Sequence, residues 1–441
     1  MSSPIHPVPS RRRFLRASAA AAGVVGATSL LAACGGNTGG VSTAGKASAS
    51  GGAGGGAKPE LSQWYHEYGE EGVEAAVKRY AAAYPDASVN VNWVKGGDTY
   101  GTKLGAGLLS NSGPDVFENQ ITVDAVKAGE YAPLDDVIAD VRDDFTDSAL
   151  ELATVDGKVY GIPMIQDMQL LYYRKSLLQA AGVKPPTTLD ELISVSKKLT
   201  TPKQKGFFAG NDGGAGVLGP LVLFANGAGL VTEDKTKAGF TGEAAVSGLA
   251  KLRTLYTSGA LLLGSPTDWS DPGAFINGLT AMQWTGLWAL PAITAKFGDD
   301  VGVLPFPKDS SAGSDSVPVG DFNELVSAKS KNVDAAKAYV KWLWIDKTDY
   351  QLDFAQDYGF HIPPRKSVAA KADKLSTGIA KQVTQFAIDL GRPTSPPYWT
   401  GTMGTAFTDM VTKIVQGGAD PQPVVKAAAT VVDRELTRQS R

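Results

Sequence analysis

The chain has few cysteines and histidines, and each shortage excludes a class of protein. Its 441 residues include one cysteine, Cys34, so no disulfide can form within the chain and its stability must come from an apolar core. Only two histidines, His66 and His361, lie beyond the first 33 residues, which makes a histidine-rich metal site improbable. We therefore expect no disulfide scaffold, no metal and no cofactor.

An excess of basic residues is also missing. The chain has 42 lysines and arginines against 45 acidic residues, for a formal net charge of −3. Loss of residues 1–33 would remove four arginines and no acid, leaving 38 basic and 45 acidic residues, about −7. Proteins that bind nucleic acid need a basic stripe, so we expect no nucleic-acid partner.

Catalytic motifs are absent or incomplete. No Walker A sequence and no G-x-S-x-G elbow are present. Gly214–Gly219 satisfies G-x-G-x-x-G, but no second strand ending in an acidic residue follows, which favours a loop that packs closely or lines a ligand. His66-Glu67 begins like a zinc-protease helix and lacks the second histidine. We predict a protein that is not an enzyme, although a pair of catalytic carboxylates stays open because only geometry identifies one.

Only one long apolar run is present, from Ala17 to Ala33, and it is at the lower limit for a membrane span. The basic stretch Ser10–Arg16 precedes it, so residues 1–33 are predicted to be a signal peptide. Ser10–Arg16 resembles the twin-arginine export motif, and Leu31–Cys34 resembles a lipobox, in which the cysteine is acylated, for example with palmitate. The sequence thus predicts export and a lipid anchor on Cys34; the alternative is an ordinary cleaved signal with an incidental cysteine.

Residues 34–58 are nearly all small or polar and cannot bury enough apolar surface to offset their ordering entropy. We expect a flexible tether with a reach of roughly 25–30 Å. The remaining length suggests two or three lobes.

Apolar periodicity in the rest of the chain predicts alternating strands and helices, which is typical of an α/β fold. Thr188 and Glu191 form a capping-box pattern at a helix start. We expect strands at 61–66, 89–93, 115–117 and 170–173, a hairpin over 155–163, and helices at 69–84, 99–109, 176–181, 188–199, 333–344 and 405–416.

Aromatic and carboxylate residues occur together at positions that read as loops or strand ends. Sugars are recognised by this combination, because ring C–H faces pack on aromatic rings while hydroxyls donate to carboxylates and amides. Core packing is the alternative for each tryptophan. The groups are Trp64–Glu67, Phe117–Asn119, Asp167 before Tyr172-Tyr173, Trp269, Trp284 with Trp288, Asp321–Asn323 and Tyr398-Trp399.

Leu170–Leu192 resembles a known family in its order of features: a tyrosine-rich strand, an Ala-Gly-Val turn, a proline pair and a Thr-x-x-Glu-Leu helix. The family is the extracellular solute-binding proteins (family 1) of ABC-type sugar importers, the maltose-binding class. Further agreement comes from Gly113–Val116, Gly157–Pro163, Ala281–Gly286, Asp334–Leu343 and Gly359–Pro363.

The resemblance implies an α/β, two-lobed periplasmic-binding-protein fold of type II, with mixed sheets flanked by helices and a hinge between the lobes. By analogy the chain crosses between lobes near Asp167, Pro305 and His361. Lobe 1 would then comprise residues 59–167 and 305–360, and lobe 2 residues 168–304 and 361–441.

The resemblance also implies ligand-binding positions in the cleft between the lobes. Asp167 matches a cleft carboxylate, and Trp288 and Trp399 match aromatic residues that stack on sugar rings. Glu118 and Asn119 fall where the first lobe presents cleft residues, and their polarity argues against maltose. The full set of expected contacts is Tyr65, His66, Glu67, Glu118, Asn119, Asp167, Trp284, Trp288, Asp321 and Trp399.

The leading hypothesis is a lipid-anchored, extracytoplasmic receptor that captures a mono- or oligosaccharide. It would act as a monomer and deliver the sugar to a membrane permease that works with a separate ATPase. One alternative is a surface-anchored glycan hydrolase. Another is the same fold with a non-sugar ligand such as a polyamine or peptide, which Glu67, Glu118 and Asp167 could serve.

Overall fold

The computed structural model describes residues 58–94, 97–110 and 112–440. The predicted signal peptide, Cys34 and all but the last residue of the predicted tether lie outside these residues. Among the helices that are described, none is long and apolar enough to cross a membrane.

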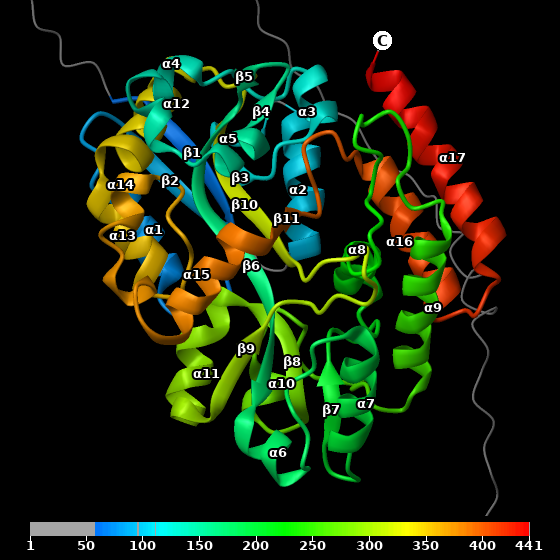
Figure 1. Cartoon of the computed structure of the whole chain (residues 1–441). Coiled ribbons are helices and arrows are strands. Elements are labelled where there is room, and N and C mark those ends of the chain that lie inside the picture. The colour runs from blue at the N-terminus through cyan, green and yellow to red at the C-terminus, as the bar shows by residue number, and fades with distance from the viewer. Residues whose placement is uncertain (1–57, 95–96, 111, 441) are drawn as a thin grey trace, which may run out of the picture. The chain divides into compact units, whose positions relative to one another are not determined.

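One long strand, β6 (Gly161–Arg174), belongs to two groups of strands and runs through the middle of the fold (Figure 1). Its first half pairs antiparallel with β10 (Val317–Val326), where Met168 lies opposite Val319. Its second half pairs antiparallel with β8 (Thr280–Gly286), where Gln169 lies opposite Gly286. The change of partner falls directly after Asp167 and Met168 and divides the fold into two lobes.

Lobe 1 is built on the strand order β2-β1-β3-β10-β6, in which β1 is parallel to both β2 and β3 while β10 is antiparallel to β3 and β6. Helices pack around this sheet. Its elements are β1 (Glu60–His66), α1 (Val73–Ala82), β2 (Ser88–Val94), α2 (Gly97–Leu109), β3 (Val116–Asn119), α3 (Val123–Lys127), α4 (Asp135–Ile138), η1 (Ala139–Asp144), α5 (Asp147–Ala153), β4 (Thr154–Val155), β5 (Lys158–Val159), α12 (Val333–Lys341), η4 (Trp342–Asp346), α13 (Thr348–Gln356) and α14 (Lys366–Ala369).

Lobe 2 is built on β6, β8 and β7, with β9 pairing with the end of β6. Two C-terminal helices, α16 and α17, pack against each other and against this lobe, as Figure 1 shows in orange and red. Its elements are α6 (Lys175–Ala180), α7 (Leu189–Leu199), β7 (Lys205–Phe208), α8 (Ala215–Phe224), α9 (Glu243–Thr257), α10 (Gly273–Ile276), η2 (Leu287–Ala289), α11 (Leu290–Phe297), η3 (Gly298–Asp300), β9 (Val301–Leu304), η5 (Asp373–Leu375), α15 (Gly378–Leu390), α16 (Gly401–Val415) and α17 (Pro421–Gln439). The short strand β11 (Gly391–Pro393) follows α15 and pairs parallel with the start of β10.

Each lobe has its own apolar core. In lobe 1, Tyr80, Tyr339 and Trp344 are completely buried between the helices and the sheet. In lobe 2, Phe207 and Trp284 are buried in the same way. Full burial of a large apolar side chain contributes about 1.5–3 kcal/mol, so the two cores can hold two lobes without disulfides.

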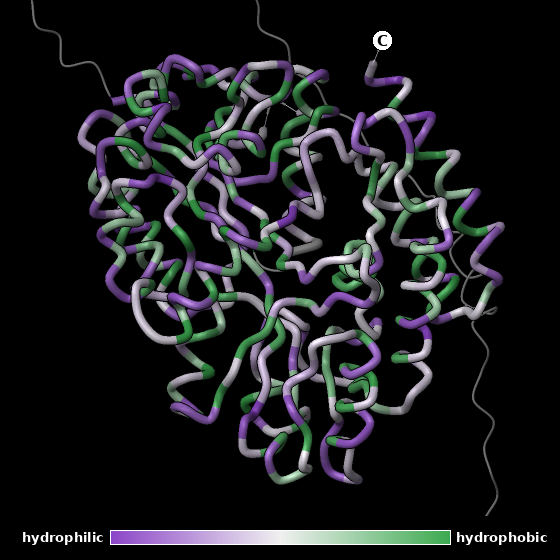
Figure 2. Tube along the Cα trace, in the orientation of Figure 1, coloured by the Kyte–Doolittle hydropathy of each residue, from purple (hydrophilic) through white to green (hydrophobic). Residues whose placement is uncertain are grey.

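The helices are amphipathic, with one buried and one solvated face. Along α17 the buried residues Val425, Ala429, Val432 and Leu436 recur at helical spacing. Figure 2 shows the result as alternating green and purple segments along the helices beside the core.

The expected elements are present with shifted ends. The predicted helix at 69–84 begins only at Val73, because Gly72 has a φ of +96° and acts as its N-cap. The capping box at α7 is partly formed, since Thr188 accepts from the Glu191 N–H at 3.2 Å. The Glu191 carboxylate accepts from Thr187 at 2.7 Å instead of from Thr188.

The contacts displace two expected lobe boundaries. After Pro305, Phe306 stays in the core of lobe 2, and the Asp309 N–H donates to the Ala225 carbonyl at 2.8 Å. After His361, Arg365 binds Asp144 of lobe 1 at 2.8 Å. The segments that join the lobes therefore extend beyond the positions that the resemblance implied.

Candidate functional site

A cavity of about 440 Å³ lies where β6 changes partner; we call it the inner cavity. Five residues expected to contact a ligand lie in its lining: His66, Glu67, Asp167, Trp288 and Asp321. The other lining residues are Tyr68, Gly69, Glu70, Gln120, Leu152, Met168, Gln169, Asp268, Trp269, Ser270, Pro318, Val319, Gly320, Phe322, His361, Thr394 and Ser395.

Glu118 contacts both the backbone and the side chain of His66. The strand β1 ends at His66, and the parallel strand β3 next to it carries Glu118. One carboxylate oxygen of Glu118 accepts from the His66 backbone N–H at 2.6 Å and contacts its Nδ1, while the other accepts from the Tyr68 hydroxyl. Burial would lower the pKa of His66, but the Glu118 carboxylate raises it, and the net shift is upward. Glu118 therefore fixes the position of His66 and favours its protonated form.

His361 lies between two carboxylates. Its Nδ1 is 2.6 Å from Asp167 Oδ1 and its Nε2 is 3.3 Å from Glu70 Oε1. Burial, with 2% of the residue exposed, would lower the pKa of His361, but the two carboxylates raise it to about 10. Burial likewise opposes the shift of Glu70, whose pKa is lowered by the hydrogen bond from His361. The charged histidine thus ties the loop after β1 to the middle of β6.

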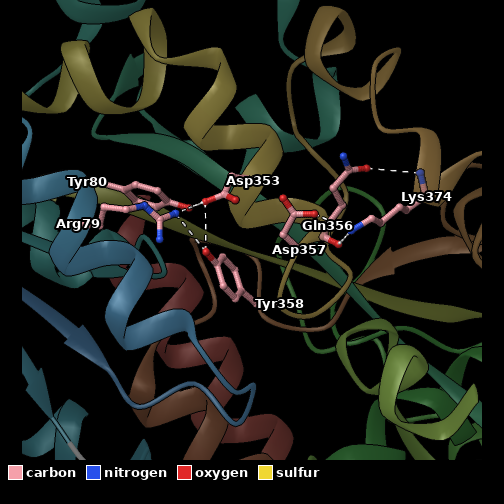
Figure 3. A network of polar contacts seen from close by, with 7 residues as sticks. All are labelled: Arg79, Tyr80, Asp353, Gln356, Asp357, Tyr358 and Lys374. Carbon is pink, nitrogen blue, oxygen red and sulfur yellow. Dashed lines mark hydrogen bonds and ion pairs between the residues drawn. The ribbon is translucent and has the colours of Figure 1, made fainter. Parts of the chain in front are cut away.

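A surface network joins α1 to α13 and to Tyr358, which follows α13 (Figure 3). Arg79 of α1 donates to Asp353 of α13 at 2.6 Å, and the Tyr358 hydroxyl donates to the same carboxylate at 3.3 Å. The Glu70 side chain packs closely on Gly359, where a Cβ would lie 2.7 Å from it. Exposed ion pairs contribute little energy, so the close packing of Glu70 on Gly359 is the contact that joins the Glu70 loop to the segment before His361.

Asp321 is a buried carboxylate on β10 that faces the inner cavity with only 5% of the residue exposed. Its Oδ2 accepts from Asn323 Nδ2 at 2.9 Å. No lysine, arginine or histidine in the described part of the chain forms an ion pair with it. Burial raises the pKa of Asp321 to about 7, and the nearby charge of Asp167 adds to the shift.

Two tryptophans form the aromatic wall of the inner cavity. The rings of Trp269 and Trp288 meet edge to face with centroids 6.0 Å apart. Trp288 Nε1 donates to the Ser270 carbonyl at 2.9 Å. Gly286 lies directly under the indole, and a Cβ at this position would be 2.0 Å from the Trp288 ring. The absence of a side chain at Gly286 therefore permits the observed orientation of Trp288.

A second cavity of about 360 Å³ adjoins the first and shares Gln120, Gln169, Thr394 and Ser395 with it; we call it the outer cavity. Trp399 lies in its lining and is 9% exposed. None of its lining residues, all within the described ranges, is ionisable: Gln120, Ile121, Thr122, Gln169, Gly216, Val217, Pro220, Leu230, Thr394, Ser395, Pro396, Trp399, Thr400, Gly401, Gly404, Phe407 and Thr408.

The glycine-rich stretch at the start of α8 contributes to the outer cavity through Gly216 and Val217. Asp212 accepts from the N–H groups of Gly214 and Gly216 at 2.9 and 2.7 Å. Gly219 packs on Phe407 and Val411, with room for a Cβ only at 3.2 Å. The stretch thus packs closely and lines a cavity, as the sequence favoured.

Four expected contacts line neither cavity. Tyr65 points to the opposite face of β1 from His66, because successive strand residues alternate, and its hydroxyl donates to buried Glu324 at 2.9 Å. Glu118 lies beneath His66. Asn119 bonds Tyr131 at 3.4 Å. Trp284 is fully buried, and its Nε1 donates to Gln169 at 2.9 Å. These four residues therefore do not line either cavity. Glu118 and Trp284 instead position His66 and Gln169, which do line the cavities.

Several cavity residues were not predicted from the sequence. Gln120 follows the expected pair Glu118-Asn119 at the end of β3, so the prediction stopped one residue short. Tyr68 and Glu70 lie in the loop just after His66 and Glu67. Two further members, Trp269 and Phe322, belonged to the aromatic groups that the sequence singled out. His361 had a signal as well, since it is one of only two histidines beyond the first 33 residues.

The described residues contain no cluster of three or more histidine, cysteine, aspartate or glutamate side chains that could hold a metal ion. The arrangement offers hydrogen-bond acceptors, amides and aromatic faces, which bind and orient a polar ligand.

Comparison with known proteins identifies the family. A family model described as bacterial extracellular solute-binding protein matches residues 75–382. The chain therefore belongs to this family. The galactooligosaccharide-binding protein of Bacillus subtilis is 26% identical over 345 residues, which cover 74% of this chain and 78% of that protein.

Solved structures share the fold. An ABC transporter solute-binding protein from Thermotoga lettingae, bound with α-D-tagatose, matches with a TM-score of 0.74 at 22% identity and covers 86% of this chain and 100% of its own. A maltotriose-binding protein from Thermus thermophilus, bound with maltotriose, matches with a TM-score of 0.71 at 22% identity, with 85% of this chain and 99% of its own covered.

Proposed function

We propose that this member of the bacterial extracellular solute-binding family captures an oligosaccharide in the inner and outer cavities and delivers it to the permease of an ABC importer, without turnover. The observation that carries the proposal is the pair of neighbouring cavities, which share four lining residues and each have at least one tryptophan in their lining. Together they fall within the size range of small-molecule sites. A ligand of more than one sugar ring would occupy both.

The chemistry of the lining suits a sugar. Trp288 and Trp399 each offer an aromatic surface for the C–H face of a ring. Between them Gln120, Gln169 and Thr394 line both cavities and can donate to and accept from hydroxyl groups. Relatives that bind galactooligosaccharide and maltotriose support the same ligand class.

Delivery requires that the permease distinguish the loaded protein from the empty one. The segments around Asp167 and His361 join the lobes, and the Gln166 and Ile362 backbones exchange hydrogen bonds of 2.9 and 3.0 Å there. A ligand that contacts both walls of the cleft favours the closed arrangement, because its differential affinity shifts the population. We propose that this closed form is what the permease recognises.

Export and anchoring rest on the sequence. The proposed signal peptide at 1–33 would be removed and Cys34 acylated, so the tether at 34–58 would hold a monomeric receptor at the outer face of the cell membrane. Replacement of Cys34 by Ala should release the protein into the medium. Retention of the C34A protein in the membrane fraction would argue against the anchor.

Calorimetric titration of the purified chain against a panel of oligosaccharides tests the proposed function. At least one sugar should bind saturably with one site, and at a hundredfold excess over its Kd it should stabilise the protein by about 2.7 kcal/mol. The same sugar, recovered after prolonged incubation, should be unchanged. Cleavage of the sugar would favour the glycan hydrolase, and binding of a peptide with no sugar bound would favour a non-sugar receptor.

A further inference from the structure

Carboxylic acids are the most frequent ionisable residues in the lining of the inner cavity. Five carboxylic acids and two histidines are among its lining residues, which all lie in the described ranges, and lysine and arginine are not among them. The outer cavity, which shares four residues with it, has no ionisable lining residue in the same ranges. Charge is therefore concentrated at one end of the combined site.

The two histidines are already matched by carboxylates. His66 is paired with Glu118, which lies beneath the cavity, and His361 is shared by Asp167 and Glu70. Neither histidine forms an ion pair with Asp321 or Asp268, and the described lysines and arginines form none with them either. Two carboxylates on different walls of the cavity thus lack a cation from the protein.

Ionisation of a carboxyl group as buried as Asp321 costs free energy when no positive partner is present. Water is excluded from it, and Asp167 nearby carries the same charge. Closure of the lobes around a ligand would remove more water and raise this cost. A ligand that brought a positive charge would offset it.

Resting on the proposed function, we propose that the ligand is an amino sugar oligosaccharide whose protonated amine lies in the inner cavity, between Asp321 and Asp268, with an uncharged sugar ring in the outer cavity. The aromatic wall is consistent with a cation, because the faces of Trp269 and Trp288 attract one. Sugar acids are excluded, since their carboxylates would meet the five acids of the lining.

The test is a titration at pH 7 and low salt with matched pairs of sugars that differ only in one group; binding of the amine should itself favour the ionised form of Asp321, whose pKa is about 7. Each pair joins an oligosaccharide containing a free 2-amino sugar to its N-acetylated form, which keeps the number of rings, loses the charge and adds an acetyl group; the matching 2-hydroxyl sugar of the panel controls for that added bulk. Oligomers of glucosamine, galactosamine and mannosamine form three such pairs, and uncharged oligosaccharides of glucose, galactose and mannose, an oligogalacturonate and spermidine complete the panel. In at least one pair the free amine should bind at least tenfold tighter, and added salt should reduce this preference.

Two variants locate the charge. Asp321→Asn should bring the amine-to-acetyl preference close to one, and Asp268→Asn, at an exposed position, should reduce it and serves if Asp321→Asn folds poorly. The control Asp86→Asn changes an exposed carboxylate outside both cavities and should keep the full preference.

The outcomes separate the two proposals. If uncharged sugars bind and in every pair the acetylated form binds as tightly as the amine, the inference is wrong and the proposed function stands. If the preference survives both Asp321→Asn and Asp268→Asn, the assignment to these carboxylates is wrong. If spermidine binds and no sugar does, or if nothing in the panel binds, the proposed function is wrong and the inference fails with it.

Discussion

The inner and outer cavities share four residues and differ in almost every other respect. The inner cavity is formed by strand ends and by the segments that join the lobes. These elements bring His66 next to Glu118, and His361 next to Asp167 and Glu70. The outer cavity is lined in large part by residues near the start of α8 and α16, among them Gly216 and Gly401. Under the proposed function, the inner cavity would set the charge and orientation of the ligand, and the outer cavity would accept an uncharged group of limited length.

His361→Gln should have the largest effect, because it leaves Asp167 and Glu70 near each other without a cation. The loss of unfolding free energy should be about 3 kcal/mol at pH 6, measured by denaturant titration. The pKa of His361 is raised above its ordinary value to about 10 in the folded protein, so its contribution is complete below pH 6.5 and is lost as pH rises through 10. The variant should therefore lose the part of the pH dependence between 6.5 and 10 that His361 supplies.

Thr408→Ala in the outer cavity is the matched control for this variant. Thr408 carries no charge and its cavity has no ionisable residue among those described, so the change in stability should be the same at pH 6 and pH 9. Equal pH profiles for His361→Gln and the unmodified protein would contradict the role assigned to the histidine.

Trp288→Ala should weaken binding of every sugar that the protein takes, by about thirtyfold, because it removes the main aromatic face of the inner cavity. Trp399→Leu should weaken only ligands long enough to reach the outer cavity. Calorimetry with a mono- and a trisaccharide of the same sugar separates the two. Equal losses for both ligand lengths in both variants would remove the distinction between the cavities.

Gly286→Ala should reduce affinity by about tenfold, because the new methyl group would overlap the Trp288 ring and turn it out of position. Gly264→Ala is the control, since nothing lies within 4 Å of a Cβ there. Tryptophan fluorescence of the ligand-free proteins gives a second readout, which should change in the first variant alone. Unchanged affinity in Gly286→Ala would show that the orientation of Trp288 is not needed.

Arg438→Ala should have the smallest effect. Arg438 of α17 donates to Asp124 of α3 at 2.7 Å and so links lobe 2 to lobe 1. Both side chains are nearly half exposed, so loss of the pair should lower sugar affinity by about two- to threefold through the closed population, and less in high salt. Arg434→Ala, on the same helix without an interlobe partner among the described residues, should leave the affinity unchanged. A larger change in Arg434→Ala would contradict the link.

The sequence predicted the fold well because periodicity and the family resemblance both report on strands and helices. It singled out His66 and Glu67 because strand ends are recognisable; both line the inner cavity, and their contact with a ligand stays a prediction. It misplaced Tyr65 and Trp284, because the face that a strand residue presents depends on which side of the sheet becomes the cleft. The pairing of His361 with Asp167 joins residues 194 positions apart, and no local pattern reports such a contact.

Calorimetric titration of the unmodified protein and of Trp288→Ala with the best oligosaccharide of the panel shows whether a sugar binds across the two cavities. We expect saturable one-site binding to the unmodified protein and a loss of about thirtyfold or more in the variant. Binding of equal strength to both proteins, or no binding of any sugar to the unmodified protein, would contradict this expectation.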